Sequence, residues 1–260
     1  VSETYIGNWL KKNSIQRDQV VLATKVRGEM GKGPNDQGLS RVHIMNAVEA
    51  SLRRLQTDHI DLYQAHWTDD DTSIEETLRA FDDLVKQGKV RYVGVSNYAA
   101  WELMHSLWVS DKNKLVRYDS LQPHYSLIHR DEFERELRAV CETYGIAVIP
   151  YSPLAGGFLT GKYRKNMPLP ESKRSEGRKR AMTDENFALI DEMEVIALRH
   201  KATISQVALA WMLADPVVTS PIIGATSIQQ LNENLGALNV KLSEDEMALL
   251  NKMTAWKENE

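Results

Sequence analysis

The hydrophobic residues of the chain form two alternating kinds of segment. Short apolar runs rich in β-branched residues are typical of buried strands, and longer segments with apolar residues three or four positions apart are typical of amphipathic helices. The pattern predicts strands at 20–26, 60–66, 90–96, 119–122, 146–149 and 220–223. It predicts helices at 2–12, 39–55, 74–87, 100–109, 131–144, 184–199, 203–213, 227–237 and 243–253, with Ser2 as a cap of the first.

Strand and helix alternate at intervals of roughly 30 residues, which is the spacing of βα units. Such alternation predicts a parallel sheet with helices outside it. The chain has 260 residues, of which 42% are hydrophobic, and this length is compatible with one large α/β domain over 1–260. The irregular segment 163–183 is rich in basic residues and is expected to be a mobile surface loop over the site.

Charge and composition narrow the class of partner. The 32 basic and 36 acidic residues leave a net charge of −4 and are interspersed, so we expect a small-molecule partner and no nucleic acid or membrane. The single cysteine, Cys141, lies on a helical apolar stripe, which predicts a core residue and excludes a disulfide within the chain. With no signal-peptide pattern and no metal-ligand spacing, we expect a cytoplasmic protein without a metal. The oligomeric state cannot be read from the sequence.

Two loops that follow predicted strands carry glycines. The stretch 146–162, IAVIPYSPLAGGFLTGK, runs from a strand into a loop with Gly156, Gly157 and Gly161, and 221–227, PIIGATS, leads into a helix. Each alone is compatible with an ordinary strand-to-loop exit. Because free backbone amides at strand ends and helix starts favour phosphate, the two together indicate one extended nucleotide.

Polar residues end four successive predicted strands. These residues are Lys25, His66, the pair Ser96 and Asn97, and Gln122. Singly, Lys25 is compatible with a snorkelling lysine and His66 with a satisfied core histidine. Together they lie at the rim of a parallel barrel where catalysis takes place, with Lys25 acting electrostatically on a neighbouring acid and His66 donating to a developing oxyanion.

These motifs, in this order, resemble the aldo-keto reductases, and most of all their bacterial and potassium-channel-β-like branches. The matching segments are ATK at 23–25, IDLYQAHW at 60–67, GKVRYVGVSN at 88–97, YSPLAGGFLTGK at 151–162, VALAWML at 207–213 and PIIGATSIQQLNEN at 221–234. The resemblance implies a (β/α)8 barrel, of which this chain represents about six strands, and an NADPH-dependent reduction of aldehydes or ketones.

The resemblance also implies a set of NADP(H)-binding residues. Ser96, Asn97 and Gln122 would hold the nicotinamide carboxamide, and Tyr151 would stack on its ring. The pyrophosphate side would be lined by Ser152, Pro153, Leu154, Gly156, Leu159 and Lys162. The adenosine and its 2′-phosphate would be held by Gly224, Thr226, Gln230, Glu233 and Asn234, with Arg174 chosen among the loop arginines as a further phosphate contact.

The chain departs from the family pattern at its beginning. The family's proton donor is a tyrosine preceded by an aspartate, in a segment that comes before the stretch matching SETYIGNWL, so we expect the sequence to be part of a longer protein. Tyr5 and Tyr63 are both misplaced for this role. Two alternatives remain open at this point: an NADP(H)-binding regulatory or redox-sensing subunit with little turnover, and a barrel enzyme with a phosphate-bearing substrate.

Overall fold

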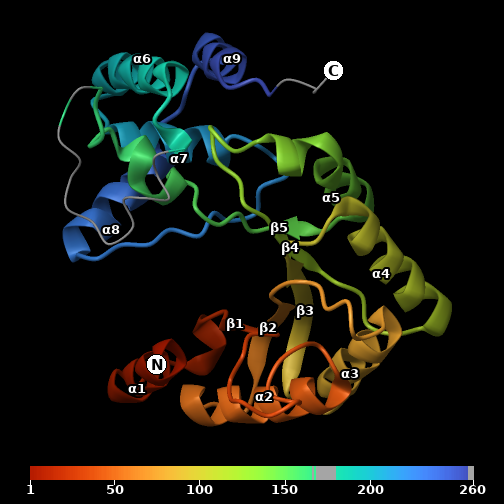
Figure 1. Ribbon diagram of the computed structural model, residues 1–260. Helices are drawn as coiled ribbons and strands as arrows, with labels where there is room; N and C mark the ends of the chain where they lie inside the picture. Colours follow the sequence, from red (N-terminus) through yellow and green to blue (C-terminus); the bar gives the residue numbers. More distant parts are fainter. Residues whose placement is uncertain (166, 168–179, 257–260) are drawn as a thin grey trace. The chain divides into compact units, whose positions relative to one another are not determined.

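The computed structural model in Figure 1 describes residues 1–165, 167 and 180–256. Within it the chain divides into two compact units. Unit 1 comprises Val1–Gln122 and Thr143–Ile146, and unit 2 comprises Pro123–Glu142 and Ala147–Glu260. Each unit is described by itself.

Unit 1 contains a parallel sheet with its helices on one face. The strands β1 (Ala23–Val26), β2 (Ile60–Ala65), β3 (Val90–Ser96) and β4 (Ser120–Gln122) lie side by side in chain order. The helices α2 (Arg41–Leu55), α3 (Ile74–Lys86) and α4 (Ala100–Asn113) connect them, and α1 (Ser2–Lys12) packs on α2. The predicted alternation of strand and helix is therefore confirmed in this unit.

The core of unit 1 lies between the sheet and these helices. Successive strand residues point to opposite faces, and Tyr63 of β2 meets Phe81 of α3 edge-on at 5.7 Å between ring centroids. Both rings are fully buried, as are Ile44 and Leu78 from α2 and α3. The opposite face of the strands is thereby left for polar side chains.

Unit 2 contains the short strand β5 (Ala147–Val148) and most of the remaining helices. The helices are α6 (Asp184–His200), α7 (Ile204–Leu213), α8 (Ile228–Leu235) and α9 (Glu244–Met253), with 3-10 segments at Ala155–Thr160 and Gly236–Asn239. Figure 1 shows α6 and α9 lying near one another, and the two helices are in contact. Hydroxyl side chains of Thr183, Thr203, Ser227 and Ser243 cap α6, α7, α8 and α9.

The helix predicted at 131–144 begins with a π-helical turn. Residues Phe133–Leu137 form this turn, and α5 (Arg138–Tyr144) continues it. Cys141 is buried on α5, as predicted, and burial raises the pKa of its thiol to about 12. A thiol with so high a pKa is a poor nucleophile, in agreement with a core role.

The prediction of a strand at 220–223 was wrong. A single parallel bridge joins Val148 and Val218, and Thr219 and Ile222 donate backbone hydrogen bonds to Val148 and Pro150. Pro150 and Pro221 have no N–H to donate, so the ladder cannot continue. For the same reason β5 is shorter than the predicted 146–149.

The structure differs from the predictions in other details as well. The first strand starts at Ala23 and not at residue 20, because the N–H of Leu22 is taken by the Asp61 carboxylate at 2.8 Å. Ser2 lies inside α1, whose cap is Val1. In the predicted loop 163–183, Tyr163 is buried, while residues 166 and 168–179 lie outside the described residues.

Candidate active site

The carboxyl ends of the unit 1 strands bring polar side chains to one face of the sheet. The register pairs Lys25 with Gln64 and Ser96 with Gln122. Because side chains alternate along a strand, His66 shares the face of Gln64, two residues earlier. Lys25, His66, Ser96 and Gln122 therefore lie on one face, opposite the helices.

Lys25 and His66 are coupled electrostatically. Desolvation by burial lowers the pKa of Lys25, and the structure gives it no ion-pair partner among the described residues. The pKa of His66 is lowered first by burial and then by the charges of Lys25 and Arg27, so its imidazole is neutral at neutral pH. Its ring stacks on Trp67 with 3.5 Å between centroids. A neutral imidazole beside an ammonium group is suited to donate a hydrogen bond to an oxygen that gains negative charge.

Hydrogen bonds hold Ser96, Asn97 and Gln122, the three residues predicted to bind the nicotinamide carboxamide. The amide nitrogen of Asn97 donates to the carbonyl of His66 at 3.0 Å and to Oγ of Ser96 at 3.1 Å. Oγ of Ser96 donates to the carbonyl of Gln122 at 2.8 Å. Asn97 adopts a left-handed backbone conformation with φ 57°, which asparagine tolerates better than most residues. These contacts fix the ends of β3 and β4 to one another.

Sequence reasoning missed two polar residues on this face. Gln64 accepts a long hydrogen bond of 3.4 Å from Gln122, and the buried hydroxyl of Ser120 has no hydrogen-bond partner within the described part of the chain. Both lie two residues before a predicted site residue on the same strand, and the two-residue period of a strand was the signal that would have identified them.

Tyr63 and Tyr5 are the two tyrosines that the sequence predicted to be misplaced for the role of proton donor. The hydroxyl of Tyr63 is buried on the helix-facing side of the sheet. Burial raises the pKa of this hydroxyl, and the charge of Glu3 raises it further. Tyr5 is exposed on α1. The predicted position of Tyr63, on the face opposite the polar strand ends, is confirmed.

Unit 2 contains a cleft of about 830 Å³ lined by both glycine-bearing loops. The predicted residues that line it are Ser152, Pro153, Leu154, Gly156, Lys162, Gly224, Thr226, Gln230, Glu233 and Asn234. The two loops are some 70 residues apart in the sequence, and their meeting in one cleft was expected from the nucleotide interpretation. A cleft of this size is within the range of small-molecule and cofactor sites.

The first loop winds through left-handed backbone conformations. Positive φ angles occur at Ser152, Ala155, Gly156, Gly157 and Gly161. A Cβ atom at Gly157 would lie 3.2 Å from Nζ of Lys162, so glycine leaves room for the lysine to reach the cleft. Glycines at such positions allow a ligand to approach the backbone closely.

The second loop ends at the amino end of α8. The side-chain oxygen of Gln230 accepts hydrogen bonds from the amide and the hydroxyl of Thr226, both at 2.9 Å. Ser227 caps the helix by accepting from the amide of Gln230. Backbone amides at the start of a helix, and the dipole behind them, favour an anion in this part of the cleft.

The cleft contains further residues that the sequence reasoning did not name. They are Gly157, Thr160, Ser205, Ile222, Ile223 and Ala225. Ser205 is buried in the first turn of α7, behind the capping box of Thr203 and Gln206. That capping pattern was the signal in the sequence, because it marks where helix amides become available.

Two predicted cofactor residues of unit 2, Tyr151 and Leu159, are not among the described residues that line the cleft. Leu159 is fully buried in the core of unit 2. Tyr151 is half-buried immediately before the cleft, and burial, followed by the charge of Glu132, raises the pKa of its hydroxyl. Arg174 lies outside the described residues.

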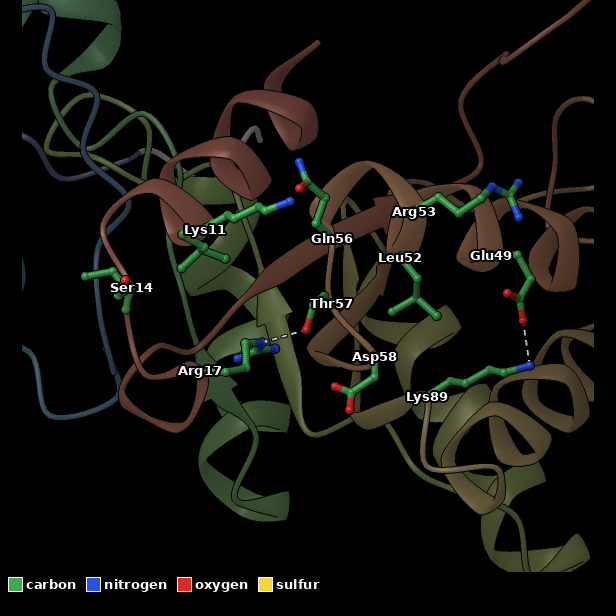
Figure 2. Close-up of a pocket in the computed structure, with 12 residues that line it drawn as sticks. Lys11, Ser14, Arg17, Glu49, Leu52, Arg53, Gln56, Thr57, Asp58 and Lys89 are labelled. Atoms are coloured by element: carbon green, nitrogen blue, oxygen red, sulfur yellow. Dashed lines mark hydrogen bonds and ion pairs between the residues drawn. The ribbon is translucent and has the colours of Figure 1, made fainter.

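A larger open cleft of about 950 Å³ lies in unit 1, at the amino ends of the strands (Figure 2). Two of its cations are neutralised, since Lys89 pairs with Glu49 at 2.5 Å and Arg17 pairs with Asp61 at 2.6 Å. Arg17 also donates to Thr57, as drawn in Figure 2. In parallel α/β proteins this end of the strands serves stability, so the cleft is not the candidate site.

The described residues contain neither a membrane-spanning helix nor a metal-binding cluster. No helix there is long and apolar enough to cross a membrane. No cluster of three or more histidine, cysteine, aspartate or glutamate side chains there has the arrangement of a metal site.

Comparison with known proteins identifies the family of the chain. The model of the aldo/keto reductase family matches residues 1–255. Uncharacterized oxidoreductase YrpG of Bacillus subtilis is 36% identical over 256 residues, which cover 96% of this chain and 77% of that protein. Protein tas of Escherichia coli is 37% identical over 273 residues, covering 95% and 78% of the two chains.

A third relative carries a different name. The putative voltage-gated potassium channel subunit beta of Schizosaccharomyces pombe is 37% identical over 246 residues, which cover 91% of this chain and 71% of that protein. The family match, the oxidoreductase among the relatives and the polar strand ends support a general oxidoreductase role. The chain belongs to the aldo/keto reductase family, whose fold is the (β/α)8 barrel.

Proposed function

We propose that this protein reduces aldehydes or ketones to alcohols with NADPH as the cofactor. The observation that carries the proposal is the cleft of unit 2, where two loops distant in sequence bring together the residues that the family resemblance assigns to NADP(H). When bound, the cofactor supplies the hydride that reduces the carbonyl carbon.

The donors around the cleft fit a phosphate-bearing ligand. The cleft has the ammonium group of Lys162 and the hydroxyls of Ser152, Thr160 and Thr226, with Glu233 as its one carboxylate among the described residues. Cations, hydroxyls and amides at helix starts are the groups that bind phosphate oxygens in proteins. In this proposal Lys162 binds the pyrophosphate, and the start of α8 binds the adenosine end.

The polar face of unit 1 takes the nicotinamide carboxamide. Ser96 and Gln122 are buried, Oγ of Ser96 donates to the carbonyl of Gln122, and the amide nitrogen of Asn97 donates to Oγ of Ser96. Their side chains offer both donors and acceptors, which an amide group requires on its two ends. The family resemblance assigns Tyr151 to the nicotinamide ring.

Lys25 and His66 act on the carbonyl chemistry. The neutral imidazole of His66 orients the substrate carbonyl and donates to its oxygen as negative charge develops. The ammonium group of Lys25 stabilises that charge and lowers the pKa of the tyrosine that the resemblance implies as proton donor. Trp67, stacked on His66 and exposed, offers an apolar surface beside the reacting group.

Turnover of a carbonyl panel tests this proposal. The native protein is mixed with NADPH and a series of aldehydes and ketones, and the absorbance band of the reduced nicotinamide is followed with time. We expect substrate-dependent loss of the band. Tight NADPH binding with no loss across the panel would instead favour the regulatory alternative, for which the name of the Schizosaccharomyces pombe relative is the precedent.

A further inference from the structure

Two histidines and Tyr151 form a stack of three rings in unit 2. The His124 ring lies parallel to the Tyr151 ring, with 5.0 Å between centroids and 8° between planes. The His129 ring lies on His124, at 3.7 Å and 28°. We refer to His124, His129 and Tyr151 as the histidine stack. None of the roles described above uses either histidine.

The backbone holds the histidine stack together. His124 and Tyr151 form a parallel bridge, in which the amide of Tyr151 donates to the carbonyl of Pro123 at 2.9 Å. Ser126 and His129 exchange two backbone hydrogen bonds of 3.0 and 3.1 Å, and this turn returns His129 over His124. The rings are therefore brought together by fixed main-chain contacts, and not by the chance meeting of two flexible side chains.

We propose that His124, supported by His129, is a positioning residue that holds the Tyr151 ring in the orientation needed to stack on nicotinamide. This inference rests on the proposed function, because it assigns Tyr151 to the nicotinamide ring. His124 covers one face of Tyr151, and a ring supported in this way loses little freedom when a ligand stacks on it. His124 should thus affect affinity for the nicotinamide end of the cofactor and leave affinity for its adenosine end unchanged.

The electrostatics of the histidine stack agree with a positioning role. Burial, and then the neighbouring His129, lowers the pKa of His124 to about 4, so the ring behind Tyr151 is neutral at neutral pH. Nε2 of His129 lies 3.1 Å from the exposed carboxylate of Glu132. A neutral imidazole places no positive charge behind an oxidised nicotinamide, which is itself a cation.

Binding of two ligands to matched variants tests the proposal. His124→Leu keeps a similar volume without a ring, and His124→Phe keeps the ring. Affinities for NADPH and for adenosine 2′,5′-bisphosphate, which lacks the nicotinamide, are measured by calorimetric titration. We expect His124→Leu to weaken NADPH by about two- to twelvefold, the range that corresponds to an aromatic pair. His124→Phe should stay within about twofold, and neither variant should change the bisphosphate affinity.

Three results of this titration would overturn the proposal. They are equal losses for both ligands, no loss for NADPH in His124→Leu, and a loss in His124→Phe as large as that in His124→Leu. If the wild-type protein binds neither ligand, the proposed function fails and the nicotinamide role of the histidine stack fails with it.

A measurement without cofactor separates the histidine stack from the proposed function. The protein is labelled with 3-fluorotyrosine, and the Tyr151 resonance is identified by its absence in Tyr151→Phe. We expect the resonance to move in His124→Leu, because the ring current of the stacked imidazole is lost, and to remain closer to its wild-type position in His124→Phe. An unmoved resonance in His124→Leu shows that His124 does not hold Tyr151, whatever the titrations give.

Discussion

Lys25 shows how burial changes the properties of a single residue. Its side chain leaves the end of β1 on the polar face of the sheet, and desolvation lowers its pKa. Its charge also helps to lower the pKa of His66, after the larger effect of burial. The same side chain has no part in the cleft of unit 2.

We predict that Lys25→Met in the native protein lowers kcat for carbonyl reduction by about 10² to 10⁴, the contribution of general acid catalysis. Cofactor affinity should stay within a few-fold, because Lys25 acts on the proton donor and not on the nucleotide. Steady-state kinetics and an NADPH titration check this. A variant that loses NADPH binding and retains turnover would show that the role assigned to Lys25 is wrong.

The lowered pKa of His124 predicts a pH-dependent stability. It is about 4 in the folded protein against an ordinary value of 6.5, with His129 and Glu132 as the charged neighbours. Between these values the unfolded state binds more protons than the folded state, so the free energy of unfolding falls as the pH is lowered from 6.5 towards 4.

Urea unfolding at a series of pH values measures this dependence. We predict that His124→Phe, which keeps the ring but cannot be protonated, loses part of the decrease in stability between pH 6.5 and about 4. If wild type and variant decrease equally over this range, protonation of His124 does not contribute.

The close approach of strands β3 and β4 depends on one glycine. Gly94 is paired with Ser120, and a Cβ at Gly94 would lie 2.2 Å from the Ser120 hydroxyl and 2.9 Å from its carbonyl oxygen. The two strands end in Ser96 and Gln122, which are predicted to bind the nicotinamide carboxamide and are joined by one hydrogen bond. A displacement at Gly94 is therefore carried to the candidate site.

We predict that Gly94→Ala lowers the free energy of unfolding by about 1–3 kcal/mol, the usual range for overpacking, and weakens NADPH binding. Gly28→Ala is the matched control, since Gly28 is exposed and a Cβ there meets no atom within 4 Å. The control should change stability by less than about 0.5 kcal/mol. Chemical denaturation and NADPH titration of both variants test this prediction. Equal changes in unfolding free energy and in NADPH affinity for the two variants would contradict it.

The chain as a whole carries a net charge of −4, yet the cleft of unit 2 is suited to anions. Lys162 supplies a positive charge there, and the first turn of α8 supplies backbone amides. The overall charge of the chain does not determine this preference, because the field at a site is set by the groups that the fold gathers there.

We predict that the protein binds NADP(H) about tenfold or more tightly than NAD(H), since one charge-assisted bond to the 2′-phosphate contributes ~1.5–3 kcal/mol. Lys162→Met should weaken both cofactors alike, because the pyrophosphate is common to them, and should leave the preference intact. Fluorescence titration with both cofactors measures this, and equal affinity of the wild type for them would contradict the preference.

Lys165→Met is the control for this prediction. It removes the same charge close by in sequence, but Lys165 pairs with Asp184 and does not line the cleft. We expect its affinities to match those of the wild type. A loss equal to that of Lys162→Met would attribute the effect to net charge and not to contact with the cofactor.

The sequence determined the features that depend on neighbouring residues. Apolar spacing predicted α2, α3 and α9 closely, because a helix or strand buries the side that its own period makes hydrophobic. Ordered motifs predicted the family and most of the cleft lining. The prediction of a strand at 220–223 was wrong. Its apolar residues were visible in the sequence, but its pairing with β5, which prolines interrupt, was not.

Only the tertiary structure determined which side chains meet. Three features depend on segments that come together only in the fold. They are the pairing of Lys25 with Gln64, the burial of the Ser120 hydroxyl and the stacking of His124 on Tyr151. Sequence spacing reports the face on which a side chain lies. The contacts of that face, and the pKa values that follow from them, depend on burial and on neighbours that other segments of the chain supply.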